Sequence, residues 1–165
     1  MNPTIGWTSF LSAETSAAAA LAGLIFVAVS INVSKILEFK IATWRAFEAL
    51  WLLMGVLFVG TFALAPNESA GELGWKFLGV GGLLWLMTAT VHIRGLWLRN
   101  TKKVQWYWVV NRIALCQCAT LSFCIAGISL IRGNPRGMYW LVPGCVFSFA
   151  SAMSSAWVLL IEILR

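Results

Sequence analysis

The 165-residue chain contains no aspartate and a single histidine, and both absences exclude classes of enzyme. Without aspartate, the chain cannot form the aspartate pair of an aspartic protease. One histidine cannot supply two axial ligands to a haem within one protomer. The patterns His-Glu-x-x-His, Gly-x-Ser-x-Gly and Gly-Lys-Ser/Thr are also missing. We therefore expect no enzymatic activity and assign no catalytic residue.

Charged residues are scarce as well, because they make up 11% of the chain whereas hydrophobic residues make up 60%. A typical soluble domain carries about 25% charged residues. Five apolar stretches fill most of the chain, each close to the ~20 residues that a spanning helix needs. They do not alternate in polarity as barrel strands do, and a helix satisfies its own backbone in lipid. The expected fold class is all-α, a polytopic membrane helix bundle forming a single transmembrane domain over residues 1–165. The five predicted transmembrane helices are Thr15–Ser34, Ala46–Ala65, Trp75–Ile93, Tyr107–Ile131 and Met138–Glu162.

Basic residues are unevenly distributed among the predicted loops. Those expected on one side are Lys35, Lys40, Arg45, Arg94, Arg99, Lys102, Lys103 and Arg165, and those on the other are Lys76, Arg132 and Arg136. The positive-inside rule then predicts an N-terminus outside and a C-terminus in the cytoplasm. The first fourteen residues hold no lysine or arginine, so we expect the first span to be retained rather than cleaved. The basic residues form no single large patch, and we expect the lipid bilayer and no nucleic acid as a partner.

Four cysteines lie in or near the spans, at Cys116, Cys118, Cys124 and Cys145. No Cys-x-x-Cys pattern occurs. Cys116 and Cys118 are two residues apart, so on a helix their side chains diverge by about 200° and cannot readily chelate one metal. We expect the cysteines to be small packing residues, with no disulfide framework, no metal and no cofactor.

Polar side chains recur at a similar depth near the predicted cytoplasmic ends of the spans. Such groups are costly inside a membrane and commonly mark functional sites. Arg112 is the most informative, because a guanidinium cannot lose its proton and must reach water or find an anion. The predicted inner-leaflet polar cluster consists of Asn32, Glu48, His92, Asn111, Arg112 and Glu162.

The sequence leaves the partners of these groups open. Arg112 either pairs with Glu48 near the inner mouth of the bundle, or reaches lipid phosphate while Glu48 pairs with Arg45 three residues earlier. His92 shares a helical face with Gly81, which favours an orientation into protein. A lone histidine in such a place is more often a hydrogen-bonded packing residue than a proton relay or a metal ligand.

Glu14 precedes the first predicted span at its outer end. An acid at that place complements the positive end of a helix. The alternative is an outer-mouth site, in which several copies of Glu14 form an acidic ring around a cation pathway.

Small residues line one face of two predicted helices. In lipid, such faces allow close backbone approach and mark helix interfaces. They either pack within the bundle or join it to another copy or a partner membrane protein. The candidate helix-packing or oligomer faces are Ser16, Ala20, Gly23 and Ser30 on the first span, and Gly144, Ser148, Ala152 and Ser155 on the fifth.

The segment Thr15–Asn32 reads TSAAAALAGLIFVAVSIN. It resembles the start of a group of small bacterial multi-pass membrane proteins, whose Ala-rich first span ends in Val-Ser-Ile-Asn before a basic loop. The resemblance implies a multi-pass protein of the bacterial inner (plasma) membrane, and it transfers no site residue to this chain.

These observations favour a non-enzymatic integral membrane protein, a homo-oligomer that forms a pathway for an ion or small solute. The alternative is an accessory or regulatory subunit that docks against a larger membrane protein complex. A third class, an enzyme acting on lipid, is supported only by Glu48, His92 and Arg112.

Overall fold

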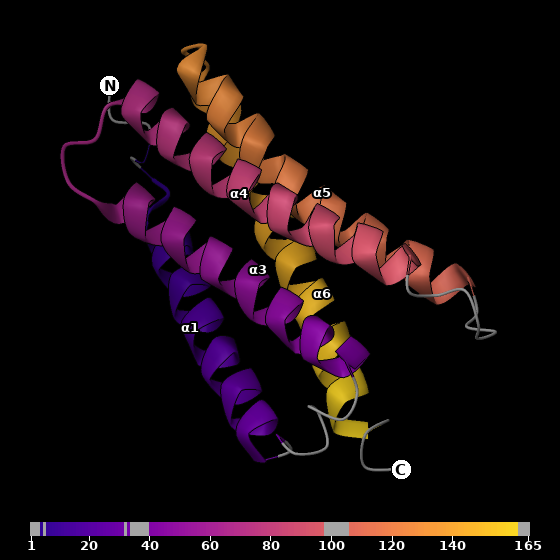
Figure 1. The fold of residues 1–165 in the computed structure, drawn as a ribbon. Helices are drawn as coiled ribbons and strands as arrows, with labels where there is room; N and C mark the ends of the chain where they lie inside the picture. Colours follow the sequence, from indigo (N-terminus) through magenta and orange to yellow (C-terminus); the bar gives the residue numbers. More distant parts are fainter. Residues whose placement is uncertain (1–3, 5, 32, 34–39, 98–105, 162–165) are drawn as a thin grey trace.

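A computed structural model of the chain describes residues 4, 6–31, 33, 40–97 and 106–161, and they form an all-α bundle (Figure 1). The expected all-α class is confirmed, whereas the count of five spans and their orientation stay predictions. Four helices are long and apolar enough to cross a membrane, over Thr8–Ile31, Thr43–Leu64, Ala70–Arg94 and Val109–Ile131. The long helices are α1 (Thr8–Ile31), α3 (Lys40–Leu64), α4 (Ala70–Trp97), α5 (Trp106–Ile131) and α6 (Leu141–Ile161), and a short 3-10 helix, η1 (Pro135–Trp140), precedes α6.

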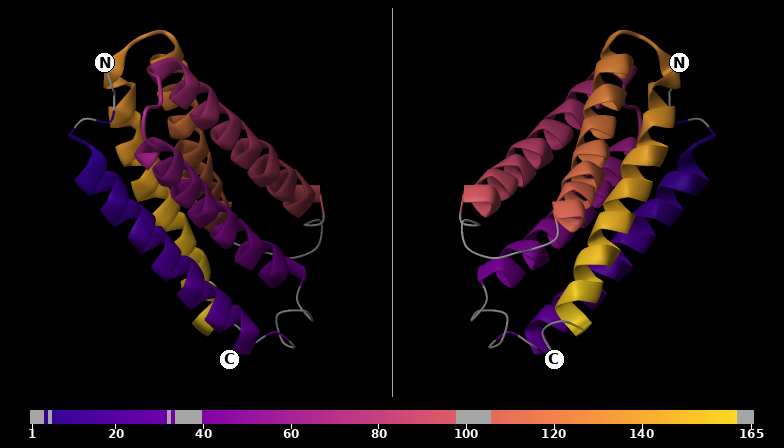
Figure 2. Two further views of the ribbon diagram at one scale, coloured as in Figure 1. Left: turned by 90° about the vertical axis from the view of Figure 1, so that its left-hand side faces the viewer. Right: turned by 90° about the vertical axis from the view of Figure 1, so that its right-hand side faces the viewer.

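The helices alternate in direction along the chain, with α1, α4 and α6 antiparallel to α3 and α5 (Figures 1 and 2). We call the end where α3 and α5 begin the inner end, because the distribution of basic residues predicts that it faces the cytoplasm. In both views of Figure 2, α1 lies on one side of the bundle and the α4–α5 pair on the other, with α3 and α6 between them.

Three helices begin five to seven residues earlier than the sequence predicted, and one of them is α3, which begins at Lys40 rather than Ala46. α1 begins at Thr8 rather than Thr15, because Leu11 is buried in the core and its N–H donates to the Trp7 carbonyl at 2.9 Å. α4 begins at Ala70 rather than Trp75. Ser69 caps it reciprocally, since Glu72 N–H donates to Ser69 Oγ at 3.3 Å and Ser69 N–H donates to Glu72 Oε2 at 3.1 Å.

Glycines bring α4 and α5 into backbone contact. A Cβ on Gly74 would lie 2.8 Å from the Gly127 carbonyl oxygen, and one on Gly81 would lie 2.9 Å from the Cys124 nitrogen. Gly74 also contacts Ile131. Gly81 follows Gly74 by seven residues on α4, and Cys124 precedes Ile131 by seven residues on α5, so the two helices keep one antiparallel register. Continued toward the inner end, this antiparallel register brings His92 of α4 between two residues one turn apart on α5, Arg112 and Cys116.

The two small-residue faces have different environments. The face on α6 is buried within the bundle, where it lies at Gly144, Ser148, Ala152 and Ser155. The face on α1 is exposed, at Ser16, Ala20, Gly23 and Ser30. α1 contacts the bundle through the opposite side, which carries Leu11, Ala18 and Ile25. Packing within the bundle therefore accounts for the α6 face and leaves the α1 face uncovered by described residues of this chain.

The outer half of the bundle is filled with large apolar side chains. Phe77 of α4 and Phe123 of α5 are fully buried there, and the Phe123 ring fills the space beside Gly144 of α6. The fully buried large side chains of this core also include Leu11, Leu73, Leu130, Met138 and Leu141. The buried carboxylate and imidazole among the described residues, Glu48 and His92, lie instead in the inner half.

Candidate functional site

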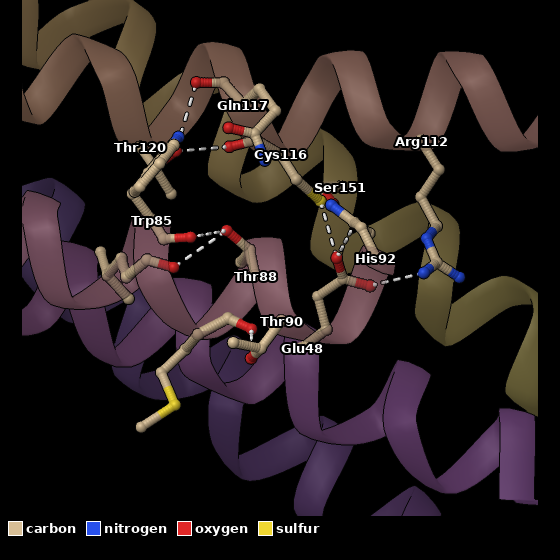
Figure 3. Close-up of polar contacts among 12 residues, drawn as sticks. Glu48, Trp85, Thr88, Thr90, His92, Arg112, Cys116, Gln117, Thr120 and Ser151 are labelled. Atoms are coloured by element: carbon tan, nitrogen blue, oxygen red, sulfur yellow. Dashed lines mark hydrogen bonds and ion pairs between the residues drawn. The ribbon is translucent and has the colours of Figure 1, made fainter. Parts of the chain in front are cut away.

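Glu48 is the centre of a polar site formed by four helices (Figure 3). Only 1% of its side chain is exposed, although it is a carboxylate. It lies eight residues into α3, about 12 Å from the start of the helix at ~1.5 Å per residue. We call the site the Glu48 cluster, and its members are Glu48 of α3, His92 of α4, Arg112 and Cys116 of α5, and Ser151 of α6.

The two oxygens of Glu48 have different partners. Oε1 lies 2.6 Å from His92 Nε2 and accepts the Cys116 S–H at a sulfur-to-oxygen distance of 3.2 Å. Oε2 lies 3.2 Å from Arg112 Nη2. Cys116 Sγ is 3.0 Å from Ser151 Oγ, which joins α6 to the cluster. The carboxylate thus contacts side chains of α4 and α5 directly, and Cys116 connects it to α6.

The ion pair is unequally exposed to its surroundings. The Arg112 side chain is 21% exposed, against 1% for Glu48. At 3.2 Å the attraction between the two charges is about 5 kcal/mol for an effective dielectric constant near 20, and the cost of removing both charges from water offsets it. The guanidinium therefore connects a fully buried carboxylate to the surface.

Several polar atoms of the cluster lack an aligned hydrogen bond to any described residue. They include Glu48 Oε2, Arg112 Nε and both ring nitrogens of His92, whose side chain is 5% exposed. Buried polar groups in proteins are normally hydrogen-bonded, so this concentration is unusual. The groups lie at ion-pair distances from one another, but their hydrogen-bonding capacity is incompletely used.

The structure brings together three residues of the predicted inner-leaflet polar cluster: Glu48, His92 and Arg112. The predicted pairing of Arg112 with Glu48 is present. Asn111 is exposed and does not belong to the site, because it lies about 100° around α5 from Arg112. Asn32 and Glu162 lie outside the described residues.

Glu14 is not at the start of its helix, as the sequence analysis assumed. α1 begins at Thr8 and has no acid in its first turn, so a role in complementing the helix end is excluded. Glu14 is partly buried in the outer half of α1, and its Oε2 has no hydrogen bond to a described residue. The acidic ring around an outer mouth stays a prediction.

The sequence analysis missed two members of the Glu48 cluster. Cys116 is four residues after Arg112 and therefore on the same face of α5. Once Arg112 was expected to face Glu48, this spacing could have predicted that Cys116 faces Glu48 as well. Ser151 is adjacent to the predicted residue Ala152, and its place depends on the rotation of α6, which no local sequence pattern determines.

The cluster also combines three kinds of metal ligand. One donor atom from each of Glu48, His92 and Cys116 lies within 4.8 Å of the others, and all three residues are buried. From the sequence, the cysteines and His92 were each judged poor candidates for metal ligands when taken separately, and they were not combined with Glu48. Cys116 and Cys118 do diverge, since Cys116 is buried and Cys118 exposed, but Cys116 meets donors from two other helices.

Comparison with known proteins gives one similarity and no family assignment. The chain is similar to the probable peptidoglycan glycosyltransferase FtsW of Halomonas elongata, with 25% identity over 186 residues. The alignment covers 92% of this chain and 46% of that protein, so the chain spans about half the length of its curated relative. No family model and no solved structure matches the chain. The similarity to a membrane protein and the four apolar helices agree on a multi-pass membrane protein.

Proposed function

We propose that this protein is non-enzymatic and provides a pathway for an ion or small solute across the bacterial inner membrane. The observation that carries the proposal is Glu48, a buried carboxylate that contacts an imidazole and a guanidinium from neighbouring helices. Ionisable groups inside a membrane bundle are costly to retain, and they typically serve ion pathways and proton relays. The Glu48 cluster is the proposed point at which the permeant species is selected.

The exposure of the cluster supports access from the inner end. Arg112 is the partly exposed member, and it directly contacts Glu48. Beyond the cluster the buried hydroxyls of Thr88, Thr120 and Ser148 donate to carbonyls of their own helices at 2.9, 3.1 and 2.8 Å. The apolar outer core follows. Passage through one bundle therefore requires the outer half to open, and this arrangement represents a state closed at its outer end.

The exposed α1 face supports assembly into a homo-oligomer. Gly23 is at its centre, and a Cβ added there would meet no heavy atom within 4 Å. A face of small residues allows a second helix to approach closely in lipid. We propose that copies of the chain associate through α1, with the N-terminus outside and the C-terminus in the cytoplasm.

The same face favours a second candidate function, an accessory subunit that docks on a larger membrane complex. A helix of another protein would pack against α1 just as a second copy would. Purification in mild detergent separates the two functions, because a symmetric homo-oligomer supports the pathway and a fixed partner at constant stoichiometry supports the subunit.

The similarity to FtsW supports the membrane setting of the proposal. The glycosyltransferase activity named for that protein is not proposed for this chain, which covers 46% of it. The alternative of an enzyme acting on lipid would use the Glu48 cluster for catalysis rather than for permeation. Turnover of lipid by the purified protein without ion flux would favour that enzyme.

Flux in liposomes tests the pathway. The purified protein is reconstituted, and the movement of protons and monovalent cations is followed with entrapped dyes. We expect Glu48→Gln to lower the flux at least tenfold, with His92→Ala and Arg112→Gln also reducing it. Asn111→Ala is the matched control, because Asn111 adjoins Arg112 but is exposed. Flux equal to that of empty liposomes, or unchanged flux in a folded Glu48→Gln variant, contradicts the proposal.

A further inference from the structure

We propose that Glu48, His92 and Cys116 bind a divalent cation of the zinc class in the inner half of the bundle. The proposal stands on the donor atoms and does not require that the protein conduct anything. The three donors come from α3, α4 and α5, so they are brought together by the packing of the helices and not by a local sequence motif.

The donor spacing is close to that of a tetrahedral zinc site. Zinc bonds to nitrogen, oxygen and sulfur of ~2.0–2.3 Å place neighbouring ligand atoms about 3.3–3.6 Å apart. Glu48 Oε1 lies 2.6 Å from His92 Nε2 and 3.2 Å from Cys116 Sγ. The remaining distance, between the His92 and Cys116 donors, is within 4.8 Å, so metal binding requires the 2.6 Å contact to lengthen by about 0.7 Å while the three donors turn toward one point.

The chemical nature of the donors selects among metals. Magnesium and calcium prefer sites made of oxygen atoms, and copper(I) prefers sulfur. One imidazole, one carboxylate and one thiolate suit zinc, which accepts all three. The fourth place would go to a water molecule or to Ser151 Oγ, which lies 3.0 Å from Cys116 Sγ.

His92 gives an independent indication of a ligand. Its side chain is 5% exposed, and neither ring nitrogen has an aligned hydrogen bond to a described residue. Buried polar atoms are normally paired, and coordination through Nε2 would replace its poorly aligned contact with Glu48 Oε1, 2.6 Å away, by a bond to the metal. At 2.6 Å from Glu48 Oε1, Nε2 donates its proton to the carboxylate, and that proton would move to Nδ1 when the Nε2 electron pair binds the metal.

Metal binding leaves the site with one net positive charge, that of the partly exposed Arg112. Cys116 loses its thiol proton to solvent, and the sulfur electron pair forms the bond to the metal. The thiolate and the Glu48 carboxylate together neutralise a divalent cation, while neutral His92 adds a lone pair. Arg112 keeps its contact with Oε2, 3.2 Å away, and leaves Oε1 for the metal. Such outer partners typically orient metal-binding carboxylates.

Cobalt(II) is the probe for this site, because a thiolate bound to it gives a charge-transfer absorption in the near ultraviolet. The full-length protein in detergent is stripped with a chelator and titrated with the cobalt salt. We expect the band to saturate at one cobalt per chain, to disappear on addition of zinc, and to be accompanied by release of one proton. Zinc should also raise the thermal unfolding temperature.

Two sets of variants identify the ligands. Cys116→Ser preserves size and hydrogen bonding, and we expect it to lose the cobalt band and the thermal stabilisation by zinc. The matched control replaces Cys118, Cys124 and Cys145 together by serine and should retain both. The proposal is overturned if the wild-type protein gives no band, or if the band persists in Cys116→Ser. It is equally overturned if the control variant loses the band while remaining folded. Because the titration measures binding alone, absence of flux in liposomes would not alter its outcome.

Discussion

Replacing Arg112 by glutamine will destabilise the bundle more than replacing Glu48 by glutamine, although both changes break the same ion pair. Arg112→Gln leaves a carboxylate that is 1% exposed without its cation. Removing one partner of a buried pair typically costs about 3–5 kcal/mol. Glu48→Gln leaves Arg112, which is 21% exposed and can turn its guanidinium to the surface. Glu48→Gln should therefore lower the free energy of unfolding by about 1–3 kcal/mol, which is the usual penalty for leaving buried polar groups without hydrogen bonds.

The double variant, Glu48→Gln with Arg112→Gln, measures the coupling. It leaves no buried charge, so we expect it to be less destabilised than the sum of the single changes, by about 1–3 kcal/mol. Unfolding by sodium dodecyl sulfate in mixed micelles, followed by fluorescence of the ten tryptophans, gives these free energies.

Glu68 and Lys76 at the outer end provide a control pair. Their side chains are 18% and 38% exposed, so both members of this pair reach water, and such pairs contribute at most about 1 kcal/mol. Their double-mutant cycle should therefore show the smaller coupling. If Arg112→Gln and Glu48→Gln lower the free energy of unfolding equally, the asymmetry is refuted. If the loss in the double variant equals the sum of the two single losses, the coupling is refuted.

The remaining predictions concern helix contacts. Gly81→Ala places a methyl group 2.9 Å from the Cys124 nitrogen and should cost about 1–3 kcal/mol in the same assay, whereas Gly79→Ala, with nothing within 4 Å, should be neutral or slightly stabilising. Similar effects of both changes would show that α4 and α5 do not meet through this face. Gly23→Leu should dissociate the proposed oligomer in a light-scattering measurement without altering thermal stability, while Ala17→Leu, exposed but off that face, should not. An oligomer retained in Gly23→Leu would remove the assembly role of α1.

Much of the bundle could be predicted from the sequence because the bilayer restricts the choices. Long apolar stretches in lipid become helices, so the helical class and the approximate positions of the spans followed. Helix ends were harder to place. α1 extends seven residues beyond its predicted start because Leu11 packs in the core, and burial of a single leucine depends on neighbours that are distant in sequence.

Part of the Glu48 cluster was also predictable, because the bilayer restricts where charged side chains can lie. Glu48 and Arg112 were expected at similar depth with opposite charge, and a guanidinium in lipid needs an anion. Cys116 and Ser151 were not found, because their participation depends on helix rotation and register. The contacts of Gly74 and Gly81 with α5 determine that register, and whether a glycine faces a neighbouring helix or lipid is not visible in the sequence. Gly79, which has no such contact, illustrates the ambiguity.

Solid-state NMR in lipid tests most directly whether these side chains meet inside the bundle. The chain contains one histidine, so ¹⁵N-labelled imidazole reports on His92 alone. With ¹³C in the glutamate carboxyl groups, contact with Glu48 predicts strong dipolar dephasing, equivalent to a nitrogen-to-carbon distance of about 3–4 Å. The dephasing should vanish in Glu48→Gln and persist in Glu72→Gln. Absence of dephasing in the wild-type protein, or its persistence in Glu48→Gln, would contradict the account.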